Sequence, residues 1–226
     1  MRLVLPRLYV ILDASLIVSG ELDKARTLAE CGVRLVQYRG KNQSSGQQLR
    51  MASQLAKFFE RRGVTFLVND RPDIALLAGA AGVHVGQEDL SVEDARKVLG
   101  PGKWVGVSTH SLEQVRRAAE STADYIAVGP IFPTTTKANP DAVVGTALIR
   151  EARGVTEKPV VAIGGITLET APQALAAGAD SLVVISDIWR APDPRARIEQ
   201  YQKLLAAGAE DRIQHQTTGK ETLEAG

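Results

Sequence analysis

Side chains suited to binding phosphate and a divalent metal follow several of the short apolar runs in this sequence. Gln37, Arg39 and Lys41 alternate at the end of one run, so an extended backbone carries an amide, a guanidinium and an amine on one side. Asp70 and Asp89 follow two later runs, and carboxylates of this kind hold Mg²⁺ together with water and substrate phosphates. A polyphosphate bound with Mg²⁺ would balance both sets of charges.

The loop 129–137, Gly-Pro-Ile-Phe-Pro-Thr-Thr-Thr-Lys, is a second stretch that could do chemistry. Glycine frees the backbone and proline lacks an N–H donor, so Gly129 and Pro130 must end the apolar run that precedes them. Three hydroxyls and one amine follow, from Thr134, Thr135, Thr136 and Lys137. These groups can hold phosphate oxygens, although threonines in a loop can also satisfy their own turn.

Other apolar runs end in residues that could offer a side chain or a backbone N–H to an anion: Asn69, Ser108, Gly164, Gly165, Ile185 and Ser186. In a (β/α)₈ barrel, backbone N–H groups beyond strands seven and eight often form a phosphate site. The sequence therefore predicts two anion sites at one rim, one assisted by a metal ion and one built mostly from backbone.

The elements that must position these residues alternate along the chain. Eight short apolar runs predict strands at 8–12, 33–38, 64–68, 82–85, 104–107, 125–128, 160–163 and 182–185. Segments with helical spacing lie between them, such as 45–61, and a capping box of Ser111 with Gln114 is expected to begin another helix. Strands that read as continuous apolar runs are typical of a parallel sheet covered by helices.

We therefore predict an α/β fold, a single (β/α)₈ TIM barrel over residues 1–207, with the active site at the C-terminal ends of the strands. An open doubly wound sheet is the competing fold, but it more often carries a glycine-rich dinucleotide loop after the first strand, where Asp13-Ala-Ser stands. Residues 208–226 are polar without an apolar period, and we expect a mobile C-terminal tail.

Composition limits the classes of binding partner and the cellular compartment that we expect for this protein. The 226 residues carry a net charge of +1, which gives no reason to expect nucleic acid or a membrane surface as a partner. No apolar stretch approaches the roughly twenty residues of a membrane span. The single cysteine, Cys31, is interpreted as buried filler, and a cytoplasmic location is expected because it cannot form an intramolecular disulfide. A homo-oligomer is possible.

Six short motifs in this order resemble those of the thiamine-phosphate synthase family over roughly residues 8–205. They are Gln37-Tyr38-Arg39-x-Lys41, Val68-Asn69-Asp70, His84-x-Gly86-Gln87-x-Asp89, Gly106-Val107-Ser108, Gly129-Pro130-Ile-Phe-x-Thr134-x-Thr136-Lys137 and Ile163-Gly164-Gly165-Ile166. Two positions depart from the pattern: Gly40 stands where an acidic residue is common, and Ala127 where a glycine often precedes the Gly-Pro turn.

The resemblance implies a transferase of thiamine biosynthesis that couples a hydroxymethylpyrimidine diphosphate to a thiazole phosphate, giving thiamine phosphate and pyrophosphate. Carried over by position, Gln37 addresses the pyrimidine, and Asp70 with Asp89 holds Mg²⁺. The resemblance implies that the diphosphate is bound by Arg39, Lys41, Asn69, Ser108 and Lys137. Of these, Arg39, Lys41, Ser108 and Lys137 are the expected catalytic residues. The thiazole phosphate falls to Thr134, Thr136, Gly165, Ile185 and Ser186, and the substrate-binding set also includes Tyr38, Gly40 and Thr135.

Other interpretations remain open from the residues alone. Asp70 could cap a helix before Pro72, Arg39 and Lys41 could be solvated charges, and we interpret His84 as a core histidine rather than a base. Two other functions compete with the synthase. One is a related thiazole tautomerase, which would need a proton-shuttling base, and the other is a non-catalytic barrel that binds thiamine phosphates. The sequence does not decide between a carboxylated and a non-carboxylated thiazole.

Overall fold

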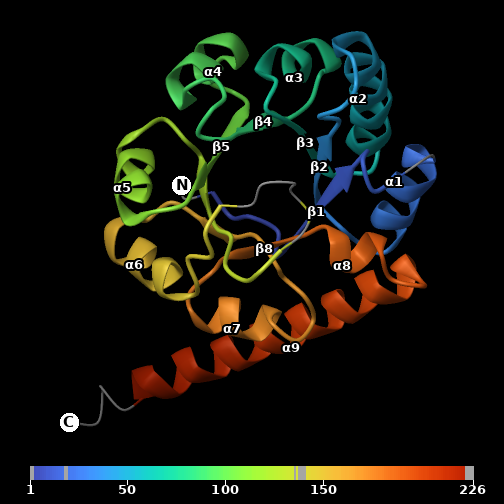
Figure 1. Cartoon of the computed structure of the whole chain (residues 1–226). Helices are drawn as coiled ribbons and strands as arrows, with labels where there is room; N and C mark the ends of the chain where they lie inside the picture. The colour runs from blue at the N-terminus through green and yellow to red at the C-terminus, as the bar shows by residue number, and fades with distance from the viewer. Residues whose placement is uncertain (1–2, 18–19, 135, 137–140, 222–226) are drawn as a thin grey trace.

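The fold is a closed barrel of eight parallel strands, each followed by at least one helix (Figure 1). The computed structural model describes residues 3–17, 20–134, 136 and 141–221, with side chains up to residue 207. The strands are β1 (Leu8–Asp13), β2 (Leu35–Arg39), β3 (Thr65–Asn69), β4 (Gly82–Val85), β5 (Trp104–Thr109), β6 (Tyr125–Val128), β7 (Val160–Ala162) and β8 (Ser181–Val184). Pairing of β1 with β8 closes the ring, which confirms the predicted TIM barrel.

Helices surround the barrel on its outer side (Figure 1). Their bounds are α1 (Glu21–Glu30), α2 (Ser45–Glu60), α3 (Pro72–Ala78), α4 (Val92–Leu99), α5 (Leu112–Glu120), α6 (Ala147–Val155), α7 (Ala171–Ala176), α8 (Ser186–Trp189) and α9 (Pro194–Glu221). The capping boxes differ from expectation. The reciprocal pair of bonds occurs at Ser44 and Gln47 of α2, whereas Gln114 of α5 accepts from the backbone N–H of His110 instead of Ser111.

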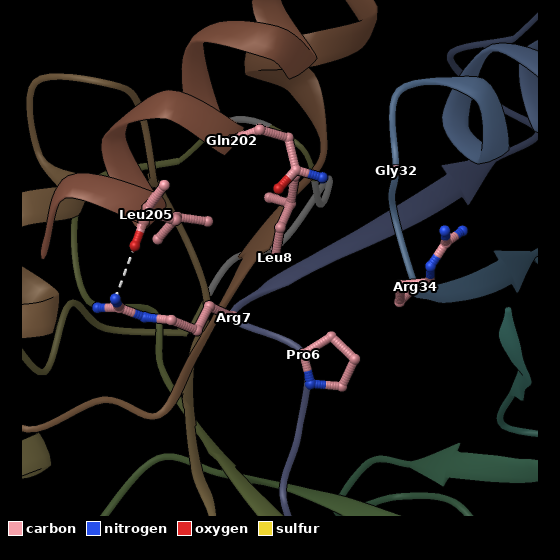
Figure 2. A pocket seen from close by; sticks show the side chains of 8 residues that line it. Pro6, Arg7, Leu8, Gly32, Arg34, Gln202 and Leu205 are labelled. Atoms are coloured by element: carbon pink, nitrogen blue, oxygen red, sulfur yellow. Dashed lines mark hydrogen bonds between the residues drawn. The ribbon is translucent and has the colours of Figure 1, made fainter. Parts of the chain in front are cut away.

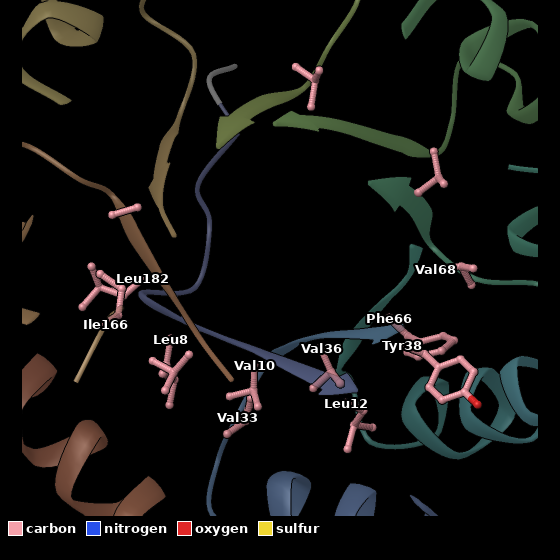
Figure 3. Close-up of a cluster of buried hydrophobic side chains, with 14 of the residues drawn as sticks. Leu8, Val10, Leu12, Val33, Val36, Tyr38, Phe66, Val68, Ile166 and Leu182 are labelled. Atoms are coloured by element: carbon pink, nitrogen blue, oxygen red, sulfur yellow. The ribbon is translucent and has the colours of Figure 1, made fainter. Parts of the chain in front are cut away.

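Alternation along each strand separates two apolar layers. One face points outward and packs under the helices, as Val10 of β1, Val36 of β2 and Val68 of β3 do (Figure 3). The other face fills the barrel interior with a smaller cluster that includes Tyr9, Leu67 and Tyr125. Because both faces are buried, the strands read as continuous apolar runs, and the eight predicted strands agree with the observed ones within two residues at each end.

The C-terminal helix crosses the predicted domain boundary. The sequence predicts that the barrel domain ends at residue 207, and α9 continues through this position to Glu221 and extends past the barrel in Figure 1. The polar composition beyond residue 207 is therefore compatible with a continued helical backbone. Its predicted mobility stays a prediction. Within the described part of the chain, no helix combines the length and apolar character needed to cross a membrane.

The N-terminal end of the barrel, which we call the floor, is held by ion pairs that also bind backbone. Arg96 pairs with Asp124 at 2.5 Å, and Arg153 pairs with Asp180 at 3.0 Å. Each carboxylate also accepts a backbone N–H of a neighbouring strand, at 2.7 Å from Val105 for Asp124 and at 2.8 Å from Val160 for Asp180. These contacts lock strand register at the end of a barrel that usually contributes stability rather than catalysis.

Candidate active site

The end of β2 carries the predicted amide and guanidinium into the barrel mouth, the rim formed by the C-terminal ends of the strands. Gln37 and Arg39 share the inward face, while Tyr38 points outward and packs in the outer apolar layer near Phe66 (Figure 3). The Tyr38 hydroxyl donates to Gln43 at 2.6 Å. The side chain of Tyr38 therefore faces away from the mouth, and any part of this residue in substrate binding would come from its backbone.

Arg39 is held by an ion pair that the sequence analysis missed. Its Nη1 lies 2.7 Å from Oδ2 of Asp13, a carboxylate only 1% exposed at the end of β1. The other oxygen of Asp13 accepts from the backbone N–H and the hydroxyl of Ser15, at 2.9 and 2.6 Å. Asp13 therefore fixes the guanidinium near the mouth. The β1–β2 register places these two residues opposite each other, and this register is known only from the structure.

Asp70 and Asp89 meet at the ends of β3 and β4. Burial first, and then the hydrogen bond and the charge of Asp89, raise the pKa of Asp70 to about 6, against the lowering effects of Lys41 and Arg39. Asp70 has a φ of 62°, a left-handed conformation that aspartate tolerates better than most residues. Asp89 also accepts from the backbone N–H of Gly86 at 2.7 Å. The structure thus brings together two like charges and two of the predicted cations.

This arrangement fits a divalent cation. Two carboxylates in contact repel each other unless a proton or a metal lies between them, and Mg²⁺ is commonly held by one or two carboxylates with waters and substrate phosphates. Groups of three or more acidic, histidine or cysteine ligands are absent from the described residues. A metal bound by Asp70 and Asp89 would therefore leave coordination positions for phosphate oxygens.

Asn69 and Ser108 also belong to the mouth. Gln37 Nε2 donates to Asn69 Oδ1 at 2.9 Å, so the amides of β2 and β3 are joined. The Ser108 hydroxyl lies 2.9 Å from Nε2 of His84, a side chain that is 7% exposed and whose Nδ1 lies 2.9 Å from the Tyr125 hydroxyl. The interpretation of His84 as a core histidine agrees with this burial, but its contact with Ser108 connects the core to the site.

The predicted second anion site is assembled from the loop after β6 and the end of β8. Thr136 Oγ1 lies 3.2 Å from the hydroxyls of both Thr134 and Ser186. Gly165 packs against the same loop with φ of 65°, and a Cβ there would lie 2.5 Å from the carbonyl oxygen of Pro133. Ile185 and Ser186 begin α8 beside this cluster. The threonines do satisfy one another here, as the plainer interpretation of the loop anticipated, yet they also gather at the mouth.

Some predicted residues are placed only in part. Lys41 is exposed, and its influence on the Asp70 pKa puts its charge near the carboxylate pair. A Cβ at Gly40 would lie 2.7 Å from Gln43 Oε1, so a side chain there would require the Gln43 side chain to shift. Thr135 and Lys137 lie outside the described residues.

Two cavities lie beside this cluster or away from it. One of about 330 Å³ opens at the floor and is lined by Pro6, Leu8 and Arg34 together with residues of α9 (Figure 2). Another of about 280 Å³ lies between α4 and α5, and Asp89 of the mouth is among the residues that line it. The clustered carboxylates, cations, amides and hydroxyls are at the mouth, as the sequence analysis expects for a (β/α)₈ barrel.

Comparison with known proteins points to one family. Residues 8–188 match the family described as thiamine monophosphate synthase. The chain is 47% identical over 206 residues to the thiamine-phosphate synthase of Koribacter versatilis, which covers 89% of this chain and 96% of that protein. It is 43% identical over 197 residues to the thiamine-phosphate synthase of Methanosarcina barkeri, covering 87% of this chain and 89% of the relative.

A solved structure agrees with these relatives. Thiamine phosphate pyrophosphorylase from Pyrococcus furiosus superposes with a TM-score of 0.81 and 33% identity, covering 89% of this chain and 96% of that one. The family match spans β1 to α8 and so includes every strand of the barrel and the described mouth residues. The chain belongs to the thiamine monophosphate synthase family.

Proposed function

We propose that this chain is a thiamine-phosphate synthase that joins an aminopyrimidine methyl diphosphate to a thiazole ethyl phosphate and releases pyrophosphate. One observation carries most of the proposal: Asp70 and Asp89 touch each other at the mouth while Arg39 and Lys41 act on the same carboxylate. Opposite charges concentrated in this way suit a diphosphate bound through Mg²⁺. The second cluster, with its hydroxyls and the start of α8, suits the phosphate of the other substrate.

The reaction explains why these residue types are needed. The bond between the pyrimidine methylene carbon and the diphosphate oxygen breaks with its electron pair leaving on the diphosphate, and the thiazole nitrogen supplies the pair for the new bond. Mg²⁺, when bound by Asp70 and Asp89, would neutralise charge on the leaving diphosphate. Arg39 and Lys41 add positive charge at the same place, and the ion pair with Asp13 holds the Arg39 guanidinium in position. We propose a like role for Lys137 from its sequence position alone, since it lies outside the described residues.

Positioning is the remaining task of the protein. The thiazole nitrogen is already a nucleophile, so it needs orientation toward the methylene carbon more than activation by a base. We assign this orientation to the grip of Thr134, Thr136 and Ser186 on the thiazole phosphate, supported by their mutual contacts of 3.2 Å. Gln37, joined to Asn69, offers an amide to the pyrimidine edge.

The experiment is a coupled assay of pyrophosphate release after mixing both substrates with Mg²⁺. We expect pyrophosphate and thiamine phosphate in equal amounts, and neither product when one substrate or the metal is left out. Isomerisation of the thiazole phosphate in the absence of the pyrimidine would instead indicate a tautomerase. Binding of both compounds without turnover would indicate a non-catalytic barrel. Either result would overturn the proposal.

The location and assembly of the protein are also proposals. A cytoplasmic enzyme is in keeping with a chain whose one cysteine, Cys31, is a free thiol. A homo-oligomer stays a prediction that a sedimentation measurement can test.

A further inference from the structure

A chain of buried hydrogen bonds crosses the barrel interior below the mouth. It runs from Asn69 to Gln37 (2.9 Å), Tyr9 (3.2 Å), Tyr125 (3.1 Å), His84 (2.9 Å) and Ser108 (2.9 Å). Its two ends, Asn69 and Ser108, are residues of the candidate active site. Its middle members, Tyr9 and Tyr125, are buried phenols with no role in the proposed reaction.

Packing holds the middle of this chain in one arrangement. The rings of His84 and Tyr125 stack with centroids 5.5 Å apart, and those of Tyr9 and Tyr125 meet edge to face at 6.2 Å. Gly106 provides the space, because a Cβ there would lie 2.0 Å from Tyr125 Cζ. A phenol fixed in this way cannot turn its hydroxyl to another partner without moving the stacked rings.

The number of protons on each group decides which partner donates in every hydrogen bond of this series. Gln37 donates through Nε2 to Asn69, so its Oε1 accepts the hydroxyl proton of Tyr9. Tyr9 has no second proton, and Tyr125 must therefore donate to Tyr9. The proton of Tyr125 is then used as well, so it can only accept from Nδ1–H of His84. In a neutral ring Nε2 is then an acceptor, and the Ser108 hydroxyl donates to it.

The two phenols keep their single protons throughout the working range of pH. Burial raises the pKa of Tyr9, and burial with the nearby Tyr9 hydroxyl raises the pKa of Tyr125 well above its usual value. Burial also favours the neutral form of an imidazole that lies between two hydroxyl groups. Each bond of the chain therefore has one donor, and reversing any bond requires reversing the others.

We propose that His84 is a positioning residue. Held as the neutral Nδ1–H tautomer by Tyr125 and Tyr9, it accepts a hydrogen bond at Nε2 from the Ser108 hydroxyl and thereby sets which groups Ser108 and Gln37 present to the substrate. The oxygen of Ser108 then offers lone pairs to the mouth, which suit a donor such as an amino group. This differs from the diphosphate contact that the family resemblance implies for Ser108, because a phosphate oxygen needs a donor.

The same direction fixes the amide of Gln37. With Oε1 turned toward Tyr9 and Nε2 toward Asn69, the unused lone pair and the unused N–H of Gln37 have set positions. A ligand edge that meets this amide must carry a donor and an acceptor in the matching order. The link to the pyrimidine substrate rests on the proposed function, whereas the tautomer of His84 does not.

The test reads the tautomer directly in the enzyme without substrates. Multiple-bond ¹⁵N–¹H correlation spectra of protein labelled at its three histidines, assigned with His84→Gln, distinguish a protonated Nδ1 from a protonated Nε2. We expect Nδ1–H in the wild type and a switch to Nε2–H in Tyr9→Phe. Without Tyr9 as acceptor, a buried Tyr125 hydroxyl is satisfied only by donating to His84.

Tyr201→Phe is the matched control. It removes the hydrogen bond of 2.7 Å from another buried tyrosine hydroxyl to Asp187, and neither residue belongs to the series of hydrogen bonds between Asn69 and Ser108. We expect it to leave both the tautomer and kcat/KM unchanged, whereas Tyr9→Phe lowers kcat/KM about tenfold, the effect of one misdirected hydrogen bond. A wild-type spectrum with Nε2–H or an imidazolium overturns the proposal, and so does a Tyr9→Phe spectrum that keeps Nδ1–H.

Two features keep the outcome decisive. If Tyr9→Phe does not fold, the spectrum of the wild type still tests the proposal. A His84 ring protonated at Nδ1 supports it, and a ring protonated at Nε2 overturns it. If the wild-type enzyme makes no pyrophosphate, the proposed function fails while the spectrum still stands, so the two failures are distinguishable.

Discussion

The carboxylates compared here have opposite kinds of partner at the two ends of the barrel. At the floor, Asp124 and Asp180 each pair with an arginine and also accept a backbone N–H from a neighbouring strand. At the mouth, Asp70 touches Asp89, another carboxylate, and its pKa is raised to about 6, first by burial and then by Asp89. Charges that satisfy one another hold strands in register. Like charges in contact cost stability and await a ligand, as expected of a functional site.

The largest effect is expected from removing a carboxylate at the mouth. Asp70→Asn should lower kcat/KM about a thousandfold, because a neutral amide cannot hold Mg²⁺ as a carboxylate does. Asparagine also tolerates the left-handed backbone at this position, where φ is 62°. The metal-free variant should melt at a higher temperature than the wild type, since repulsion with Asp89 is gone. Differential scanning calorimetry with steady-state kinetics measures both, and a lower melting temperature would contradict this account of the mouth.

The next largest effect belongs to Lys137. We expect Lys137→Ala to lose at least two decades of kcat/KM, about 2.7 kcal/mol of transition-state stabilisation, with little change in melting temperature. The reason is the loss of a positive charge from the proposed diphosphate site. Steady-state kinetics at saturating Mg²⁺ measure it. Near-wild-type turnover would remove the reason for assigning this lysine to the leaving group.

A variant at the floor should show the reverse pattern. Asp124→Ala removes the partner of Arg96 and an acceptor for the Val105 N–H, so unfolding should become easier by about 2 kcal/mol. For a chain of this size that corresponds to a melting temperature lower by roughly 5 °C. The kcat/KM of the folded fraction should equal that of the wild type. A kinetic defect at temperatures well below melting would break the division between the two ends.

A smaller effect is expected in the uncharged part of the mouth. Thr136→Val keeps the shape of the side chain but loses its hydroxyl contacts with Thr134 and Ser186. We expect KM for the thiazole phosphate to rise about tenfold, while KM for the pyrimidine diphosphate stays within about twofold. Initial rates with each substrate varied in turn separate the two sites. Equal changes in both constants would mean that the hydroxyl does not discriminate between them.

The smallest effect is the pH dependence of metal-free stability. The pKa of Asp70 is raised to about 6 in the folded protein, above the value of about 3.9 expected in the unfolded chain. The folded state therefore binds this proton more tightly. The resulting stabilisation is complete below about pH 4 and is lost as the pH rises through about 6. The melting-temperature difference between Asp70→Asn and the wild type should grow over this interval, and a constant difference would contradict the raised pKa.

Much of the fold followed from the sequence because both layers of the barrel are apolar. Strands with continuous apolar runs, such as 125–128, gave the eight positions, and the rule that chemistry lies beyond strand ends led to Asp70 and Asp89. Asp13 was missed because its pairing with Arg39 depends on the register of two strands, which no local pattern contains.

Other features needed the closed ring. In the sequence, Tyr9 and Tyr125 look like ordinary core residues. Only the closed barrel brings their hydroxyl oxygens to 3.1 Å from each other. The backbone of Asp70 at φ of 62° has no composition signal, since the following Pro72 predicts a helix start but not this conformation. The continuation of α9 beyond residue 207 was missed because a polar sequence without an apolar period looks the same in a helix and in a tail.

The most direct test of the mouth is calorimetric titration of the wild-type enzyme with pyrophosphate, with and without Mg²⁺. The account predicts binding that requires the metal and disappears in Asp70→Asn, while Asp124→Ala at the floor binds as the wild type does. Equal affinity for pyrophosphate in the presence and absence of Mg²⁺, or unchanged binding by Asp70→Asn, would contradict the claim that the paired carboxylates and the nearby cations form one diphosphate site.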